Sequence, residues 1–274
     1  MEKITLKTIT HKIETTDCVK LVFLGDTHIG AQGCDEDLIK QTVSRIQEDN
    51  TYFFDMGDRC EFINSKDPRF EFANLPQWLS LSDLVDIPKA QINRFVDLFK
   101  SISEKCLGTV EGNHEASIKT HSDRDVYQQI NEQLKFDAKV CLGTSGIVRL
   151  QFMMYNKVEW TLDVFLHHGS FGCGKKSGSA VNGLEELPLA IQADVFCVGH
   201  THKKLGKIQE RVRLNNKGKL VHSPIALINS GSFVRGFTDN DFGSYAEKRL
   251  LYPQGIGPVE LWVYPEQKQV KLVV

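Results

Sequence analysis

The stretch Leu21-Val22-Phe23-Leu24-Gly25-Asp26-Thr27-His28 joins four consecutive apolar residues to a glycine, an acid and an imidazole. An uninterrupted run of Leu, Val and Phe is typical of a strand that is buried on both faces. If the backbone stays extended beyond Gly25, Asp26 and His28 point to the same side of the chain. Ligands gather at the carboxyl ends of strands in α/β sheets. On its own, however, this pattern more often marks a turn acid and a surface histidine.

Side chains that can donate a lone pair to a metal ion follow an apolar run at four further places in the chain. These places supply Asp58, then Asn113 with His114, then His168, and finally His200 with His202. Together with the first stretch they hold five of the nine histidines, and His167 is a sixth. Because chance does not readily put most histidines directly after apolar strands, we expect the five places to form one site.

The donor types in these loops favour a transition metal. Neutral imidazole nitrogens, carboxylate oxygens and an amide oxygen suit Mn, Fe, Zn, Co or Ni better than Ca or Mg alone. About seven candidate ligands are too many for one tetrahedral ion. We therefore predict two divalent cations that share a bridging carboxylate and a bridging water, with manganese favoured and iron, zinc, nickel or cobalt as alternatives.

The charge of such a site predicts its substrate. Two divalent cations, two carboxylates and otherwise neutral ligands leave a net charge of about +2. A phosphoryl group fits between cations that lie roughly 3.5–4 Å apart, where its developing charge is stabilised. We expect a phosphate ester to bind there.

Composition excludes several other classes of protein. The 274 residues are 41% hydrophobic and 25% charged, with a net charge of −2, so nothing drives the chain as a whole toward nucleic acid or membrane. No apolar run approaches the roughly 20 residues that span a bilayer. The first residues lack the apolar core of a signal peptide. The seven cysteines are scattered without C-x-x-C spacing, which argues against a disulfide framework and favours a cytoplasmic location.

Hydrophobic periodicity predicts a chain of alternating strands and helices. Helical spacing covers residues 36–47, 89–105, 123–134 and 183–192. Apolar or alternating runs predict strands at 19–24, 51–54, 106–110, 147–155, 158–166, 194–198, 225–228, 259–264 and 269–274. Without a linker or repeat, one domain over residues 1–274 with two sheets and flanking helices is the economical interpretation. Residues 60–88 are irregular and form a predicted insertion.

The motifs as a set resemble those of the calcineurin-like metallophosphoesterases, in the order of that family. They are Gly25-Asp26-x-His28, Gly57-Asp58, Gly112-Asn113-His114-Glu115, His168-Gly169 and Gly199-His200-x-His202, followed by Asn229-Ser230-Gly231-Ser232 in place of a late Asn-Pro-Gly-Ser turn. The resemblance runs from about Val19 to Ser232. It implies an α/β fold of two mixed β-sheets packed as a sandwich between helices, a four-layer αββα arrangement.

The resemblance also implies a role for each motif residue. Asp26, His28 and His202 would hold one ion, and Asn113, His168 and His200 the other. Asp58 would bridge them, since a carboxylate has two oxygens to offer. His114 would contact the phosphate and protonate the leaving oxygen as the catalytic acid.

Three residues beside the motifs depart from the family or compete with it. Glu115 stands where the family usually has Asp, and we expect it to orient His114. Arg59 replaces the common acidic follow-up, and either contacts substrate phosphate or pairs with a surface acid. His167 competes with His168 for one ligand role, and we expect it to face the core or support the ligands.

The substrate class is less determined. Lys203 and Lys204 open a basic stretch directly after His202, which forms either a polyanion track toward the metals or an ordinary solvated hairpin. The aromatic residues from Phe62 to Trp78 either stack on a base or lipid or, as we favour, pack the insertion onto the body or into a dimer contact.

The leading interpretation is a dinuclear metallophosphoesterase that hydrolyses phosphodiester or phosphomonoester bonds with a metal-bridging hydroxide. A DNA or RNA nuclease of the same family is one alternative, which would make nucleic acid a partner. A non-catalytic metal-binding scaffold is the other. All expected ligands and His114 are present, which argues against the scaffold. We expect no membrane partner, and the sequence leaves the oligomeric state open.

Overall fold

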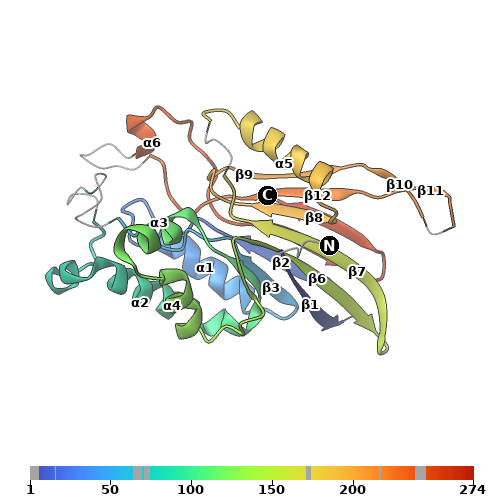
Figure 1. The fold of residues 1–274 in the computed structure, drawn as a ribbon, viewed down its shortest axis with the longest axis horizontal. Coiled ribbons are helices and arrows are strands. Elements are labelled where there is room, and N and C mark those ends of the chain that lie inside the picture. The colour runs from blue at the N-terminus through green and yellow to red at the C-terminus, as the bar shows by residue number, and fades with distance from the viewer. Residues whose placement is uncertain are drawn as a thin grey trace.

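The computed structural model describes residues 6–15, 17–63, 70, 75–170, 174–215, 217–237 and 245–274. Within these residues two six-stranded sheets stack face to face (Figure 1). The first sheet has the order β14 (Gln269–Val273), β13 (Val259–Tyr264), β2 (Val19–Leu24), β3 (Thr51–Asp55), β4 (Cys106–Val110), β5 (Cys141–Gly143). The second has the order β1 (Lys7–Glu14), β6 (Ser145–Met154), β7 (Lys157–His167), β8 (Val195–Val198), β12 (Ile225–Ser230), β9 (Lys204–Gln209).

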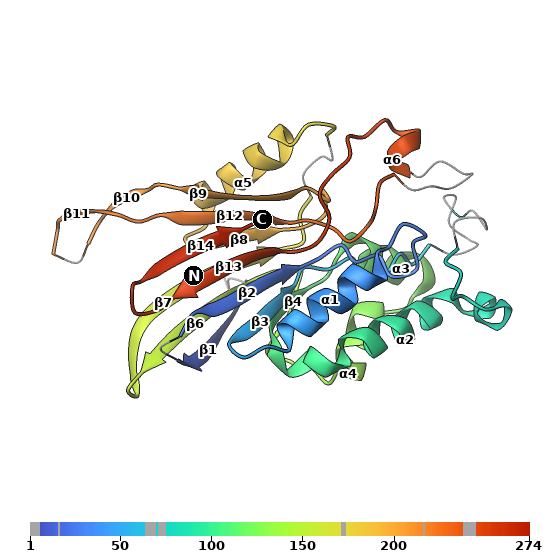
Figure 2. The ribbon, with the colours of Figure 1, turned by 180° about the vertical axis from the view of Figure 1, so that it is seen from behind.

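Both sheets are mixed. Strands β2 to β5 run parallel in the first sheet. Strand β13 joins β2 antiparallel and lies beside it in the view from behind (Figure 2). Strands β7, β8 and β12 run parallel in the second sheet, between antiparallel neighbours β6 and β9. The carboxyl ends of both parallel sets face the same end of the sandwich, so the loops that follow them can meet.

Strand β2 is buried on both faces, as its apolar run predicts. Leu21 and Phe23 belong to the core between the two sheets, together with Val148 from β6. Val22 and Leu24 face the other way and pack under the helices. This two-sided burial fixes the register of β2, and therefore the position at which Asp26 leaves the sheet.

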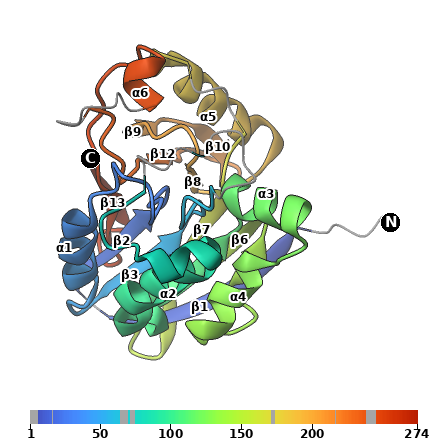
Figure 3. The same cartoon turned by 90° about the vertical axis from the view of Figure 1, so that its left-hand side faces the viewer.

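Helices cover the outer face of each sheet (Figure 3). Apolar residues of α1 (Glu36–Ile46), α2 (Ile87–Phe99) and α4 (Val126–Gln133) pack on β2, β3 and β4. Helix α5 (Gly178–Ala190) packs through Leu184 on β7, β8 and β12. The predicted α/β sandwich, with its four layers of helix, sheet, sheet and helix, is confirmed.

The ends of α1 explain why a helix forms at this place. Asp35 caps its first turn by accepting a hydrogen bond from the Leu38 N–H at 3.0 Å. At the other end Lys105 donates to the carbonyls of Ile46 and Gln47, where its charge also complements the helix dipole.

Several elements differ from the sequence-based expectations. Helix α3 (Asn113–Ser122) was not expected, because its apolar face is weak and Ile118 is its one buried aliphatic side chain. The helix expected over 89–105 ends at Phe99 and continues as a 3-10 helix over Lys100–Lys105. Two further elements were not among the expected ranges: a separate two-stranded hairpin of β10 (Val212–Leu214) and β11 (Leu220–His222), and the short helix α6 (Tyr245–Lys248).

The predicted insertion is only partly described. Residues 64–69 and 71–74, including Phe72, lie outside the described residues. Phe62 is buried and Trp78 packs against the core under the helices, as we favoured. The prediction of a single domain over the whole chain stays a prediction. No helix among the described ranges combines the length and the apolar character that crossing a bilayer requires.

Candidate metal centre

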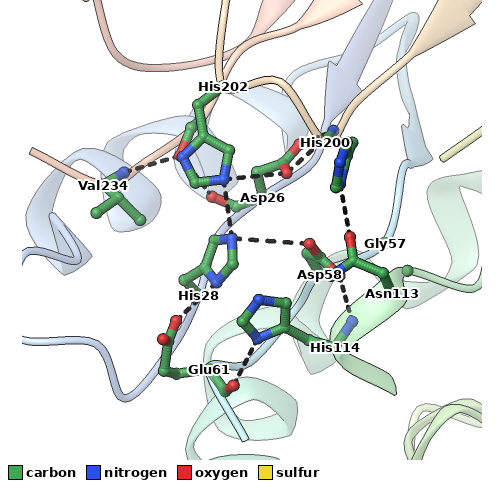
Figure 4. A network of polar contacts seen from close by, with 12 residues as sticks. Asp26, His28, Gly57, Asp58, Glu61, Asn113, His114, His200, His202 and Val234 are labelled. Carbon is green, nitrogen blue, oxygen red and sulfur yellow. Dashed lines mark hydrogen bonds and ion pairs between the residues drawn. The ribbon is translucent and has the colours of Figure 1, made fainter. Parts of the chain in front are cut away.

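The strand ends converge as the motif positions predict. Asp26 and His28 follow β2, Asp58 follows β3, and Asn113 and His114 open α3 directly after β4. The second sheet contributes the remaining histidines from the loops after β7 and β8. Figure 4 shows the side chains of Asp26, His28, Asp58, Asn113, His114, His200 and His202 directed toward one another.

The backbone conformation that brings these side chains together was not predicted from the sequence. Five of the candidate ligands have left-handed φ angles: Asp26 at 51°, His28 at 44°, Asp58 at 49°, His200 at 65° and His202 at 55°. The condition of an extended backbone after Gly25, on which the same-side argument for Asp26 and His28 rested, is therefore not met. Non-glycine residues adopt such angles at a cost of about 1–3 kcal/mol each, and they cluster at functional sites.

The first group of donors consists of Asp26, His28 and His202. The Nε2 atoms of His28 and His202 lie 3.1 Å apart, and Nε2 of His202 lies 3.4 Å from Oδ1 of Asp26. Nδ1 of His28 donates to the Glu61 carboxylate at 2.8 Å, which leaves the Nε2 lone pair directed into the site.

The second group consists of Asn113, His168 and His200. Oδ1 of Asn113 lies 3.0 Å from Nε2 of His168 and 2.6 Å from Nδ1 of His200. Nδ1 of His168 donates to the Met56 carbonyl at 2.6 Å, so its neutral tautomer also turns a lone pair toward the site.

Asp58 lies between the two groups. Its Oδ2 is 3.2 Å from Nε2 of His168 and 3.8 Å from Nε2 of His28. Its Oδ1 accepts the backbone N–H of His114 at 2.9 Å, which fixes the carboxylate at the start of α3. One carboxylate oxygen therefore faces both groups of histidines.

These contacts bring acceptors together and so fit a bound cation. Because Nδ1 of His168 donates to a carbonyl, Nε2 of the neutral ring carries a lone pair. This lone pair faces the oxygens of Asp58 and Asn113, which are also acceptors. Three lone-pair donors can coexist at this distance only around a proton or a metal ion. Imidazole and carboxylate groups within reach of one another thus fit divalent metals.

The pKa values of the buried groups also indicate that the site requires positive charge. Burial opposes the charged form of His168, but the Asp58 carboxylate outweighs it and raises the pKa of His168 to about 10. Burial would likewise raise the pKa of Asp58, but His168 beside it lowers that pKa below the ordinary carboxyl range. Asp58 therefore remains an anion that requires a positive partner.

The site is buried on one side and open on the other. Asp26, His28, Asp58 and His168 are each at most 4% exposed. Asn113 is exposed, and the side chain of His202 is 38% exposed. A substrate can therefore approach the donors from the side of α3 and the β8–β9 loop.

His114 lies at the rim of the site beside His28, with ring centres 4.6 Å apart. Its Nδ1 donates to the backbone carbonyl of Glu61 at 2.6 Å, which leaves Nε2 available for a second proton. Burial lowers the pKa of His114, but the charges of Asp58 and Glu61 outweigh burial and raise it. His114 therefore presents Nε2 at the rim of the donor groups.

Glu61 is a site residue that the sequence-based reasoning missed. Its carboxylate holds His28 and its carbonyl holds His114. Burial would raise the pKa of Glu61, but the hydrogen bond from His28 lowers it to about 2. An acid three positions after Asp58 was the available signal.

Glu115 takes a different role from the expected one. It does not orient His114: its carboxylate accepts the backbone N–H groups of Asp58 at 3.1 Å, Arg59 at 2.8 Å and Gly112 at 3.0 Å. Burial, reinforced by the charge of Asp58, raises the pKa of Glu115 to about 7. Glu115 therefore ties the loop after β3 to the start of α3.

Arg59 faces the interior and pairs with a buried acid rather than a surface acid. It is 1% exposed and pairs with the equally buried Asp55 at 2.7 Å. Its guanidinium also donates to the Thr109 hydroxyl and lies 4.9 Å from the ring centre of Tyr127. Both alternatives that the sequence left open for Arg59 are thereby replaced by a buried ion pair.

The remaining candidates lie outside the ring of donors. His167 is half-buried, and its Nδ1 accepts the Gly169 N–H at 2.7 Å. Lys203 is 5% exposed and donates to the Lys175 carbonyl at 3.2 Å, while Lys204 donates to the Ile256 carbonyl. These contacts turn the two lysines toward protein carbonyls rather than toward a solvent-exposed track.

Comparison with known proteins agrees with the motifs. The family model for the calcineurin-like phosphoesterases matches residues 19–204. Among solved structures, a metallophosphoesterase from Sphaerobacter thermophilus is 14% identical, with a TM-score of 0.40 over 93% of this chain and 87% of that one. The calcineurin-like phosphoesterase YfkN from Bacillus subtilis is 11% identical, with a TM-score of 0.39 over 77% of this chain and 90% of that one. A predicted phosphoesterase from Streptococcus pneumoniae is also 11% identical, with a TM-score of 0.33 over 94% of this chain and 99% of that one.

Comparison with curated proteins gives no match. The family model nevertheless covers more than half of the sequence and includes every candidate ligand. The chain therefore belongs to the calcineurin-like phosphoesterase family, and is a hydrolase that acts on phosphate esters.

Proposed function

We propose that the protein hydrolyses phosphodiester or phosphomonoester bonds at a centre of two divalent cations, with manganese as the favoured metal. The observation that carries this proposal is the position of Asp58, whose Oδ2 faces His28 on one side and His168 on the other. Two donor groups that meet at one carboxylate are what a two-metal site requires.

The donor groups divide the ligands between the two cations. Asp26, His28 and His202 would hold the first, Asn113, His168 and His200 the second, and Asp58 both. Cations bound there supply Lewis acidity toward phosphoryl oxygens and lower the pKa of water. The hydrogen bonds of His28 to Glu61 and of His168 to Met56 select the tautomers that leave Nε2 free to coordinate.

His114 is the residue that we assign to proton transfer. Its N–H bond to the Glu61 carbonyl orients the ring and leaves Nε2 available for the proton that a general acid needs. A proton at Nε2 of His114 would pass to the leaving oxygen as the phosphate ester bond breaks.

The nuclease and scaffold alternatives are less well supported. The nuclease hypothesis depended on a basic track that starts at Lys203 and Lys204, and these side chains contact backbone carbonyls instead. The β10–β11 hairpin, which holds Arg213, Lys217 and Lys219 of that stretch, projects from the end of the molecule opposite to α3 (Figure 1). A scaffold would not need His114 held beside a complete set of donors.

The test is hydrolysis of a substrate panel by Mn²⁺-loaded protein, with small diesters and monoesters side by side. Asp58→Ala should abolish turnover and reduce bound metal. His114→Ala should lower turnover by about 10²–10⁴-fold and leave the metal content intact. His222→Ala, an exposed histidine of the β10–β11 hairpin, is the matched control. A fully metallated wild-type protein that cleaves none of these esters would refute the proposal.

A further inference from the structure

A cavity of about 500 Å³ opens beside the loop after β2, outside the ring of candidate ligands. Among the described residues, its wall comes from residues 31–37, Lys40, residues 75–78 and Arg235. Small-molecule sites in proteins commonly occupy about 300–1,000 Å³. The cavity is therefore large enough to accept a nucleobase with its sugar.

The cavity begins one turn away from a candidate metal ligand. The His28 carbonyl accepts the Ala31 N–H at 2.9 Å, and Gly30 has a φ of 100°, as a type II turn requires at this position. The Cα atoms across such a turn lie within about 7 Å of each other. On the other side the Arg235 N–H donates to the Gly33 carbonyl at 2.8 Å, which holds the second wall in place.

The charged side chains around the cavity already form ion pairs with neighbouring side chains. The ion pairs are Asp35 with Arg235, Glu36 with Arg94, and Asp37 with Lys40. Because these charges are paired, the cavity has little net attraction for a phosphate in addition to the one expected at the metal centre. The exposed amides of Gln32 and Gln77 also line the cavity, and each offers both donors and an acceptor to a neutral polar ligand.

Trp78 supplies the aromatic surface of the cavity. The guanidinium of Arg94 lies 5.6 Å from the ring centre, and its ion pair with Glu36 at 2.6 Å holds it there. Trp78 lines the cavity, whereas Arg94 does not. A half-buried indole that is held by such a contact and lines a cavity is a suitable platform for a planar heterocycle.

We propose that this cavity binds the nucleobase and sugar of a nucleotide ester whose phosphate lies at the metal centre. The inference rests on the proposed function and names the substrate class for it. A base stacks on Trp78, Gln32 and Gln77 hydrogen-bond its edge or sugar, and the turn from His28 to Ala31 sets the spacing to the phosphate. Stacking tolerates every base, so we expect selectivity for nucleosides over simple alcohols without strong preference among bases.

The experiment compares two diesters with the same leaving group, thymidine 5′-(p-nitrophenyl phosphate) and methyl p-nitrophenyl phosphate. The ratio of their kcat/KM values measures what the nucleoside contributes. Trp78→Leu should lower this ratio about tenfold or more, and Trp78→Phe should lower it less. Trp262→Leu is the matched control, because Trp262 is a half-buried tryptophan on β13 away from the cavity, and it should leave the ratio unchanged.

A second variant guards against misfolding of the tryptophan mutant. The double substitution of Gln32→Ala and Gln77→Ala changes only exposed side chains, and should lower the ratio several-fold. A wild-type ratio near one, or a ratio that neither the Trp78 nor the glutamine variants change, would overturn the inference while leaving the proposed function in place.

A binding measurement separates the two proposals completely. Adenosine, which carries no phosphate, should quench indole fluorescence saturably in wild-type protein and in Trp262→Leu, but not in Trp78→Leu. If neither diester is cleaved by metal-loaded protein, the proposed function fails and this titration alone decides the cavity. Equal quenching in Trp78→Leu and wild type, or no quenching at all, would show that the cavity does not take a nucleoside.

Discussion

Glu61 holds His28 and His114 at the same time. Its carboxylate accepts a hydrogen bond from Nδ1 of His28 at 2.8 Å, and its backbone carbonyl accepts one from Nδ1 of His114 at 2.6 Å. One residue therefore sets the tautomer of a candidate metal ligand with its side chain and orients the candidate acid with its backbone. Side-chain substitution can separate these two roles, because the carbonyl remains in every variant.

Glu61→Ala should weaken metal binding more than it harms the acid. Loss of the carboxylate leaves His28 without its partner, and such losses typically cost about 10–100-fold in metal affinity. With saturating metal, kcat should fall only a few-fold, because the Glu61 carbonyl still orients His114. Glu61→Gln keeps an acceptor for His28 and should lie between wild type and Glu61→Ala. Competition with a metal chelator measures affinity, and an unchanged affinity in Glu61→Ala would contradict this role.

Glu115→Ala should destabilise the fold strongly. The substitution removes one carboxylate that accepts three backbone N–H groups from two loops. A buried donor left without a partner costs about 1–3 kcal/mol, so we expect a loss of about 3 kcal/mol or more in the free energy of unfolding. Glu186→Ala on the exposed face of α5 is the control, and should change that free energy by less than about 0.5 kcal/mol. Equal midpoints of urea unfolding for both variants would refute the assigned contacts.

The sequence predicts those parts of the site that depend on local pattern. The apolar run before Asp26 and the donors after each strand can be read directly from the sequence, and they predicted the side chains that converge. The four layers of the fold were implied by the resemblance of the motifs to the family. The convergence itself depends on left-handed backbone at Asp26, His28 and Asp58, which no periodicity encodes. The extended backbone that was considered for this segment is not found for that reason.

Roles that depend on distant partners could not be predicted in the same way. Glu115 bonds to Asp58 and Arg59, more than fifty positions earlier in the chain, and was assigned to its neighbour His114 instead. Arg59 directly follows a metal-site residue, yet its side chain turns into the core because it pairs there with the buried carboxylate of Asp55. Only the packing of β3 against β4 reveals which of these contacts is available.

Arg59→Leu should destabilise the protein without changing substrate affinity. The substitution leaves the Asp55 carboxylate buried without its cation, and breaking a buried pair in this way costs about 3–5 kcal/mol. KM for a small diester should stay near the wild-type value, because Arg59 does not face the donors. Arg149→Leu removes an exposed pair with Asp163 and should cost at most about 1 kcal/mol. A raised KM with wild-type stability in Arg59→Leu would restore the substrate role that the sequence left open.

Gly57→Ala should damage the metal centre through the backbone alone. Gly57 has a φ of 84°, and a Cβ placed there would lie 2.6 Å from the Gly112 backbone nitrogen. The loop after β3 must then move away from the start of α3, which displaces Asp58 relative to His168. We expect metal content and turnover to fall together. Gly218→Ala is the matched control, since Gly218 also has a left-handed φ, of 69°, but no atom within 4 Å of the added Cβ.

The control separates strain from collision. Gly218→Ala should cost about 1–2 kcal/mol of stability from the left-handed backbone and leave activity intact. Gly57→Ala carries the same strain and adds a clash with backbone that has no flexible side chain to yield. If metal-loaded Gly57→Ala turns over small diesters at the wild-type rate, the close packing of the β3 and β4 loops is not what positions Asp58.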